Sequence, residues 1–265
     1  MSKKKILSLC LVIALAAVAV LGGTLAYFTD KDADVNVMAL GNVQIVQNET
    51  DREGNAYVDG QKLVPAVKGE NYLTKDATIT DTDGKTDLPI WNNSIGNEID
   101  KFVSVTNKGT EAAYVRTILA FETVRSYEEG SSTKWTDLHD HFFLMNGDYT
   151  YLKDADGNFV YVTIDGTEYV LAVKTYADPL AAGETTTASL RQFALTWEAG
   201  NEVYDFFGEG YDILALSQAV QVQGFADGAE AALNEAFGEV TPENVLNWFN
   251  TTAIKTAGSN NVIAD

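Results

Sequence analysis

Residues 148–174, DYTYLKDADGNFVYVTIDGTEYVLAVK, contain the clearest strand and turn signals in the sequence. β-Branched and aromatic residues recur on both sides of two turn sequences, Asp154-Ala155-Asp156-Gly157-Asn158 and Asp165-Gly166. An Asp-Gly pair between alternating strands favours a two-residue type I′ turn, because glycine adopts positive φ at little steric cost. The stretch therefore predicts two consecutive hairpins that form a three-stranded meander.

Further strands are predicted on both sides of this meander, in short segments rich in β-branched and aromatic residues. The segments cover residues 43–46, 101–107, 114–124, 189–197 and 211–223. Asn107-Lys108-Gly109-Thr110 is expected to be a turn, residues 48–55 a polar turn-forming stretch, and residues 71–97 a loop with short strands.

The pattern becomes helical only after Gly224. Residues 227–237 are rich in Ala and Glu and end at Gly238. Thr241-Pro242-Glu243 then supplies an N-cap followed by proline at the first helical position, which starts a helix to about Phe249. Many short strands with late helices predict a mainly β fold, a jelly-roll-like antiparallel β-sandwich with a short helical appendage near residues 227–250.

The N-terminus predicts an exported protein. Residues 1–5 are positively charged, residues 6–23 are almost wholly apolar, and Thr24 and Ala26 are small residues at the cleavage positions. We expect cleavage between Ala26 and Tyr27, which leaves residues 27–265 as one secreted domain with no membrane attachment. A retained membrane anchor is the alternative, because the apolar run approaches the length of a span. Its Ala and Gly content and the polar residues that follow favour the signal.

Charge and cysteine content exclude several classes of function. The chain has 18 Lys and Arg against 38 Asp and Glu, a net charge of −20. Such a charge repels phosphate backbones and anionic headgroups, so we expect no nucleic-acid partner. The one cysteine, Cys10, lies in the expected signal, so the mature chain has no disulfide, thiolate nucleophile or Cys-ligated zinc.

Two groups of short motifs resemble a known family. Residues 22–30, GGTLAYFTD, and residues 40–43, LGNV, resemble substrates of the SipW-type signal peptidase, a group that includes TasA-type biofilm-matrix fibre proteins and camelysin-like surface proteins. NEIDKFVSVTNKGT at residues 97–110 with AYVR at residues 113–116 resembles the strand–turn–strand unit of these proteins, and residues 211–227 resemble a late strand of the larger members. The resemblance implies a TasA-like jelly roll in an extracellular, fibre-forming matrix or surface protein of a Gram-positive bacterium. It also implies a SipW-type signal peptidase as partner.

Camelysin-like relatives are classed as metallopeptidases, so a secreted zinc peptidase is the alternative. His139 and His141 lie two residues apart and would share one face of a strand, where they could bind one zinc. A His-Glu-x-x-His motif is absent, and no neighbouring residue is favoured as a third ligand. We therefore expect an exposed polar pair, no catalytic residue and no bound transition metal.

A calcium- or glycan-binding surface module is a further alternative. Asp81, Asp83 and Asp87 place oxygen atoms at alternate positions, as calcium loops do, but without the bidentate glutamate of a complete loop. A hairpin turn explains the similar residues from Asp154 to Asn158. Calcium is thus the one cofactor left open. A set of aromatic residues is expected in the core and in cross-strand pairs, with a glycan platform as the other interpretation. The set is Trp91, Phe142, Phe143, Tyr149, Tyr151, Tyr161 and Tyr169.

Residues 27–46 suggest a means of self-association. Val35, Val37, Val43 and Ile45 keep a rough period of two, so part of this segment can be a strand with one apolar face. An edge strand is a template for another chain, and repeated head-to-tail strand addition gives a fibre. The equal alternative is that the strand pairs within its own subunit.

Overall fold

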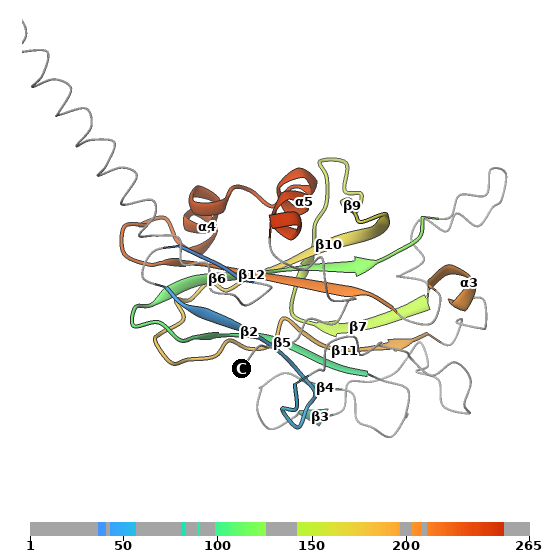
Figure 1. The fold of residues 1–265 in the computed structure, drawn as a ribbon, viewed down its shortest axis with the longest axis horizontal. Helices are drawn as coiled ribbons and strands as arrows, with labels where there is room; N and C mark the ends of the chain where they lie inside the picture. The colour runs from blue at the N-terminus through green and yellow to red at the C-terminus, as the bar shows by residue number, and fades with distance from the viewer. Residues whose placement is uncertain are drawn as a thin grey trace, which may run out of the picture.

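The fold is a sandwich of two β-sheets with short helices outside it (Figure 1). The computed structural model describes residues 37–40, 43–56, 81–82, 89–90, 99–125, 142–196, 203–207 and 211–251. Successive strands from β5 onwards mostly alternate between the two sheets, as in double-sheet jelly rolls. The expected mainly β sandwich with a C-terminal helical appendage is confirmed.

Sheet A has the strand order β1-β12-β6-β10, with β8 and β9 both paired to β10 at the far edge. The strands are β1 (Val37–Leu40), β6 (Ala113–Glu122), β8 (Thr150–Tyr151), β9 (Tyr161–Ile164), β10 (Thr167–Thr175) and β12 (Ile213–Gln221). Strands β12 and β6 form a long antiparallel pair from Ile213↔Phe121 to Gln221↔Ala113. Strand β1 runs parallel to β12, which departs from the expected antiparallel sandwich.

Sheet B has the order β2-β5-β11-β7. Its strands are β2 (Ile45–Thr50), β5 (Ile99–Asn107), β7 (Phe143–Gly147) and β11 (Leu190–Leu195). A separate two-residue pair joins β3 (Asp81–Thr82) to β4 (Pro89–Ile90), within the expected loop with short strands. The turn after Asn107 is present, but it carries the chain from sheet B to sheet A instead of closing a hairpin.

The predicted meander is half right. Asp165 and Gly166 have φ of 49° and 90°, and they join β9 to β10 as a type I′ turn requires. The first hairpin is wrong, because β8 and β9 lie end to end along β10 instead of pairing with each other along their length. The residues between them form a projecting loop, closed by the bridge between Lys153 and Phe159. Strands β8 and β9 both pair with the long strand β10. They therefore share one partner strand and do not form a hairpin with each other.

Two helices cover the outer face of sheet A, α4 (Ala229–Phe237) and α5 (Pro242–Thr251) (Figure 1). Helix α4 ends at Gly238, where φ is 93°, and the Thr241 hydroxyl accepts the backbone N–H of Asn244 at 3.2 Å, so both predicted caps are confirmed. Trp248 and Phe249 of α5 pack on the outward side chains of sheet A. Helix α3 (Val203–Phe207) was not predicted.

Arg116 fastens these helices to the sheet. Its guanidinium donates to Gln218 Oε1 at 2.6 Å, to Asn234 Oδ1 at 2.7 Å and to the Gly238 carbonyl at 2.8 Å. The guanidinium carbon also lies 5.3 Å from the centre of the Trp248 ring. One buried side chain therefore joins β6, β12, the end of α4 and α5.

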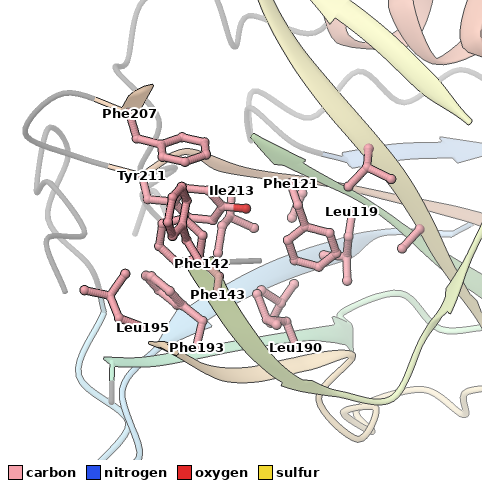
Figure 2. Packing of buried hydrophobic residues seen from close by; sticks show 14 of the residues in the cluster. Leu119, Phe121, Phe142, Phe143, Leu190, Phe193, Leu195, Phe207, Tyr211 and Ile213 are labelled. Carbon is pink, nitrogen blue, oxygen red and sulfur yellow. The ribbon is translucent and has the colours of Figure 1, made fainter. Parts of the chain in front are cut away.

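The space between the sheets is filled at one end by aromatic rings (Figure 2). Phe143 of β7 stacks on Tyr211 with ring centres 3.8 Å apart, and Phe207 of α3 meets both rings edge-on. The expected core position of the aromatic set is confirmed for Phe142, Phe143 and Tyr169, which are buried, whereas Tyr149, Tyr151 and Tyr161 are partly buried against the core. Trp91 lies outside the described residues.

Candidate functional site

Most of the site residues predicted from sequence lie outside the described residues. They are Ala26 and Tyr27 at the expected cleavage point, Asp83 and Asp87 of the calcium candidate, and both histidines, His139 and His141. Asp81 forms the start of β3. Within the described ranges, no group of three or more His, Cys, Asp or Glu is placed to hold a metal ion. No helix in the same ranges is long and apolar enough to span a membrane.

The loop that begins at Asp154 is a self-contained turn. Asp154 Oδ1 accepts the backbone N–H groups of Asp156 at 2.9 Å and Asn158 at 2.8 Å, and Oδ2 accepts the Asn158 side-chain amide at 3.1 Å. These hydrogen bonds hold the pKa of the Asp154 carboxyl below its ordinary value. The turn interpretation made from the sequence therefore accounts for these residues.

A set of polar side chains lies buried between the two sheets, and we call it the polar layer. It contains Gln47 and Glu49 of β2, Lys101 of β5, Thr117 of β6 and Ser217 of β12. The most exposed member, Gln47, has 6 % of its surface accessible, and Lys101 has none. Strand alternation explains the position, because Gln47 and Glu49 share the inward face of β2 with buried Ile45.

Hydrogen bonds join the polar layer into a chain that crosses from one sheet to the other. Lys101 Nζ donates to Glu49 Oε2 at 2.5 Å, and Gln47 Nε2 donates to Glu49 Oε1 at 2.9 Å. The Ser217 hydroxyl donates to Gln47 Oε1 at 2.6 Å, and Thr117 Oγ1 lies 3.1 Å from Ser217 Oγ. Both oxygens of the Glu49 carboxylate thus have a donor.

The polar layer holds β2 in place. A charge pair out of water is costly to bury, but removal of one partner leaves an uncompensated buried charge, at about 3–5 kcal/mol. Glu49 and Lys101 lie on neighbouring strands, and Gln47 reaches across to Ser217 and to the Ala215 carbonyl at 3.3 Å. Departure of β2 from its sheet would therefore leave a buried ammonium and a buried hydroxyl without these partners.

Strand β1 is held differently, at the edge of the other sheet. Its four residues are all half-buried, and it pairs with β12 from Val37↔Ser217 to Leu40↔Val220. Its one side-chain hydrogen bond in the described part of the chain is weak, from the Gln218 amide to Met38 Sδ at 3.4 Å. No charged group fastens this strand in these ranges.

A partly buried carboxylate, that of Glu122, lies where β6 ends and β12 begins. The backbone N–H of Asp212 donates to Glu122 Oε2 at 2.8 Å, and the Glu122 backbone N–H donates to the Asp212 carbonyl at 3.0 Å. Burial, with a smaller contribution from the Asp212 charge, raises the pKa of Glu122 to about 7. Burial and the charges of Asp212 and Glu122 also raise the pKa of the Tyr169 phenol, which lies opposite Glu122 in the sheet.

The polar layer is not among the features predicted from the sequence. Residues 48–55 were expected to be turn-forming, whereas β2 continues to Thr50 and buries Glu49. The expected strand at Lys101 is present as β5, but nothing in the local sequence indicates that its ammonium is buried. The available signal was the alternation of Ile45, Gln47 and Glu49, which places two polar residues on the same face as an apolar one.

In comparisons with known proteins, no family model, curated protein or solved structure matches this chain.

Proposed function

We propose that the protein is an exported structural component of a bacterial cell surface or biofilm matrix, and that it assembles into fibres by pairing of strand edges between subunits. The signal-like N-terminus, the cysteine-free mature sequence and the resemblance to SipW-type substrates support export and a matrix role. A SipW-type signal peptidase would release the mature chain at Tyr27. N-terminal sequencing of secreted protein should then begin at Tyr27.

The position of β1 is the observation that supports assembly most directly. This strand follows the expected mature N-terminus by ten residues and lies at the outer edge of sheet A, where β12 is its partner. An edge strand close to a chain end can leave its own sheet and occupy the same place on a neighbour. Since each subunit would donate one strand and accept another, the contact repeats without closing and gives a fibre.

The net charge of the mature chain sets the conditions for assembly; it is −23, because the signal takes Lys3, Lys4 and Lys5 from a chain of charge −20. Subunits of such charge repel one another in dilute salt, and the repulsion is screened as ionic strength rises or reduced as pH falls toward the sequence pI of about 4.3. Fibres should therefore increase with salt and with mild acid.

Electron microscopy of three purified chains tests this proposal. The first chain begins at Tyr27, the second at Val37 and the third at Val43, so that only the third lacks β1 while all three keep β2. We expect fibres from the first two in high salt, and folded monomers from the third, with circular dichroism as the check of folding. Identical fibres from all three chains would contradict strand exchange through β1, and absence of fibres from all three would contradict the fibre-forming role.

A further inference from the structure

The contact between Lys101 and Glu49 has features of a reaction site as well as of an ion pair. Both side chains are enclosed between the sheets, with side-chain exposures of 0 % and 2 %. Lys101 Nζ lies 2.5 Å from Glu49 Oε2, so the amine and the carboxyl are already in contact. Holding two reacting groups in contact removes most of the entropic cost of their reaction. Both groups are closed to bulk water, which would otherwise compete for them.

The surroundings favour attack on the Glu49 carboxyl. Gln47 Nε2 donates to the other carboxyl oxygen, Oε1, at 2.9 Å, so it stabilises the negative charge that develops there when nitrogen adds to Cδ. The Ser217 hydroxyl holds Gln47 Oε1 at 2.6 Å and orients the amide so that its N–H points to Glu49. Gln47 is in this account a positioning and charge-stabilising residue.

We propose that Lys101 and Glu49 form an intramolecular isopeptide bond after the chain has folded. A proton passes from Lys101 Nζ to the carboxyl, and the neutral amine adds to Glu49 Cδ. The Nζ–Cδ bond forms, the Cδ–Oε2 bond breaks, and Oε2 leaves as water with two of the three ammonium protons. The third proton remains on the amide nitrogen, so the step requires no oxidant, metal or co-reactant.

The bond would replace a buried charge pair by a neutral amide and join two residues that are 52 apart in the sequence. A cross-link of this kind restricts the unfolded chain as a disulfide does, in a mature sequence without cysteine. It fixes β2 to β5 covalently. This inference concerns the interior of one subunit and does not depend on whether the protein forms fibres.

Mass spectrometry of the chain that begins at Tyr27 tests the bond. We expect the intact mass to lie below the sequence mass by one water molecule, and proteolysis to yield a branched peptide that links Lys101 to Glu49. Lys101→Arg keeps the positive charge but should not form the amide, so this variant should have the full sequence mass and no branched peptide. Gln47→Leu should form the bond more slowly, seen as a larger unreacted fraction soon after refolding.

The wild-type mass decides the question even if a variant fails to fold. A wild-type mass equal to the sequence mass would overturn the proposal, as would a loss of water that maps to other residues or persists in folded Lys101→Arg. Loss of ammonia with a link between Lys101 and Gln47 would also overturn the assignment to Glu49.

Discussion

Strands β1 and β2 come from one short stretch of sequence, but the structure secures them by different means. β2 pairs antiparallel with β5 over six positions, and alternate side chains enter the space between the sheets. β1 pairs parallel with β12 over four positions and has every residue half-buried. The parallel pairing is also slightly less stable for each residue. The N-terminal segment is thus divided into β2, which buried polar contacts fix, and β1, which backbone pairing and half-buried apolar side chains hold.

This division refines the expectation drawn from the sequence. The sequence pattern predicts residues 27–46 as one segment that either leaves the subunit or pairs within it. Both described strands pair within the subunit, and in the proposed strand exchange the donated part would end between Leu40 and Ile45. Donation of β1 alone leaves the polar layer intact, since all its members lie on other strands.

The largest expected effect is from Lys101→Met, which leaves the Glu49 carboxylate buried without its cation and without the amide bond proposed above. We expect a loss of about 3–5 kcal/mol in the free energy of unfolding, measured by urea denaturation. Lys174→Met is the matched control, because its partner Asp148 is 42 % exposed and such pairs contribute about 0–1 kcal/mol. Equal losses in the two variants would mean that the polar layer does not fasten β2.

A smaller effect is expected from Gln47→Leu. This change removes the donor to Glu49 and the acceptor of the Ser217 hydroxyl, and keeps side-chain volume nearly constant. An unsatisfied buried polar group costs about 1–3 kcal/mol. The double variant with Ser217→Ala should recover part of the loss, and a strictly additive result would argue against the hydrogen-bond chain.

Glu122 offers a contrast with Glu49, because it is only partly buried and accepts a backbone N–H, that of Asp212, where Glu49 accepts an ammonium. Its pKa is raised from 4.5 to about 7, so the folded state holds the proton more tightly than the unfolded state. Stability from this group is therefore present below pH 4.5 and is lost as pH rises to about 7. Glu122→Gln should be more stable than wild type by about 1–2 kcal/mol at pH 8, a figure reduced for partial solvent screening.

The difference in stability between Glu122→Gln and wild type should disappear at pH 4, where both proteins carry a neutral group at position 122. Thermal unfolding at the two pH values measures it. A constant difference between the variant and wild type at both pH values would show that protonation of Glu122 is not its cause.

The smallest effect is expected from Met38→Ala in β1. Met38 is half-buried, and its sulfur accepts one long hydrogen bond, so we expect a loss of about 1 kcal/mol or less. Urea denaturation measures it beside Lys101→Met. A loss as large as that of Lys101→Met would mean that β1 is as firmly held as β2.

Local patterns were sufficient to predict the sandwich and its long strands. Alternation and β-branched content predicted β5, β6, β11 and β12, and cap residues predicted the two helices near the C-terminus. These signals depend on neighbours within a few residues. The same is true of the type I′ turn at Asp165 and Gly166.

Alternation can indicate that Gln47 and Glu49 face inward, but the contacts within the polar layer could not be predicted in this way, because the partners are distant in sequence. Gln47 is hydrogen-bonded to Ser217, which lies 170 positions away in the sequence. Without that partner in view, the amide side chain alone predicts Gln47 to be a surface or turn residue. The first hairpin of the meander failed for a similar reason. The local pattern of each segment predicted a strand. Which strand it pairs with depends on β10, which is distant from β8 in the pattern and pairs with both β8 and β9.

Hydrogen exchange followed by mass spectrometry tests the contrast between the two strands most directly. Amides that open only with global unfolding exchange slowly, whereas those of a strand that detaches locally exchange sooner. In dilute monomeric protein at low salt, peptides covering Val37–Leu40 should exchange by local opening while peptides covering Ile45–Thr50 remain protected to the level of the core. Equal protection of the two peptides would contradict a fixed β2 beside an exchangeable β1.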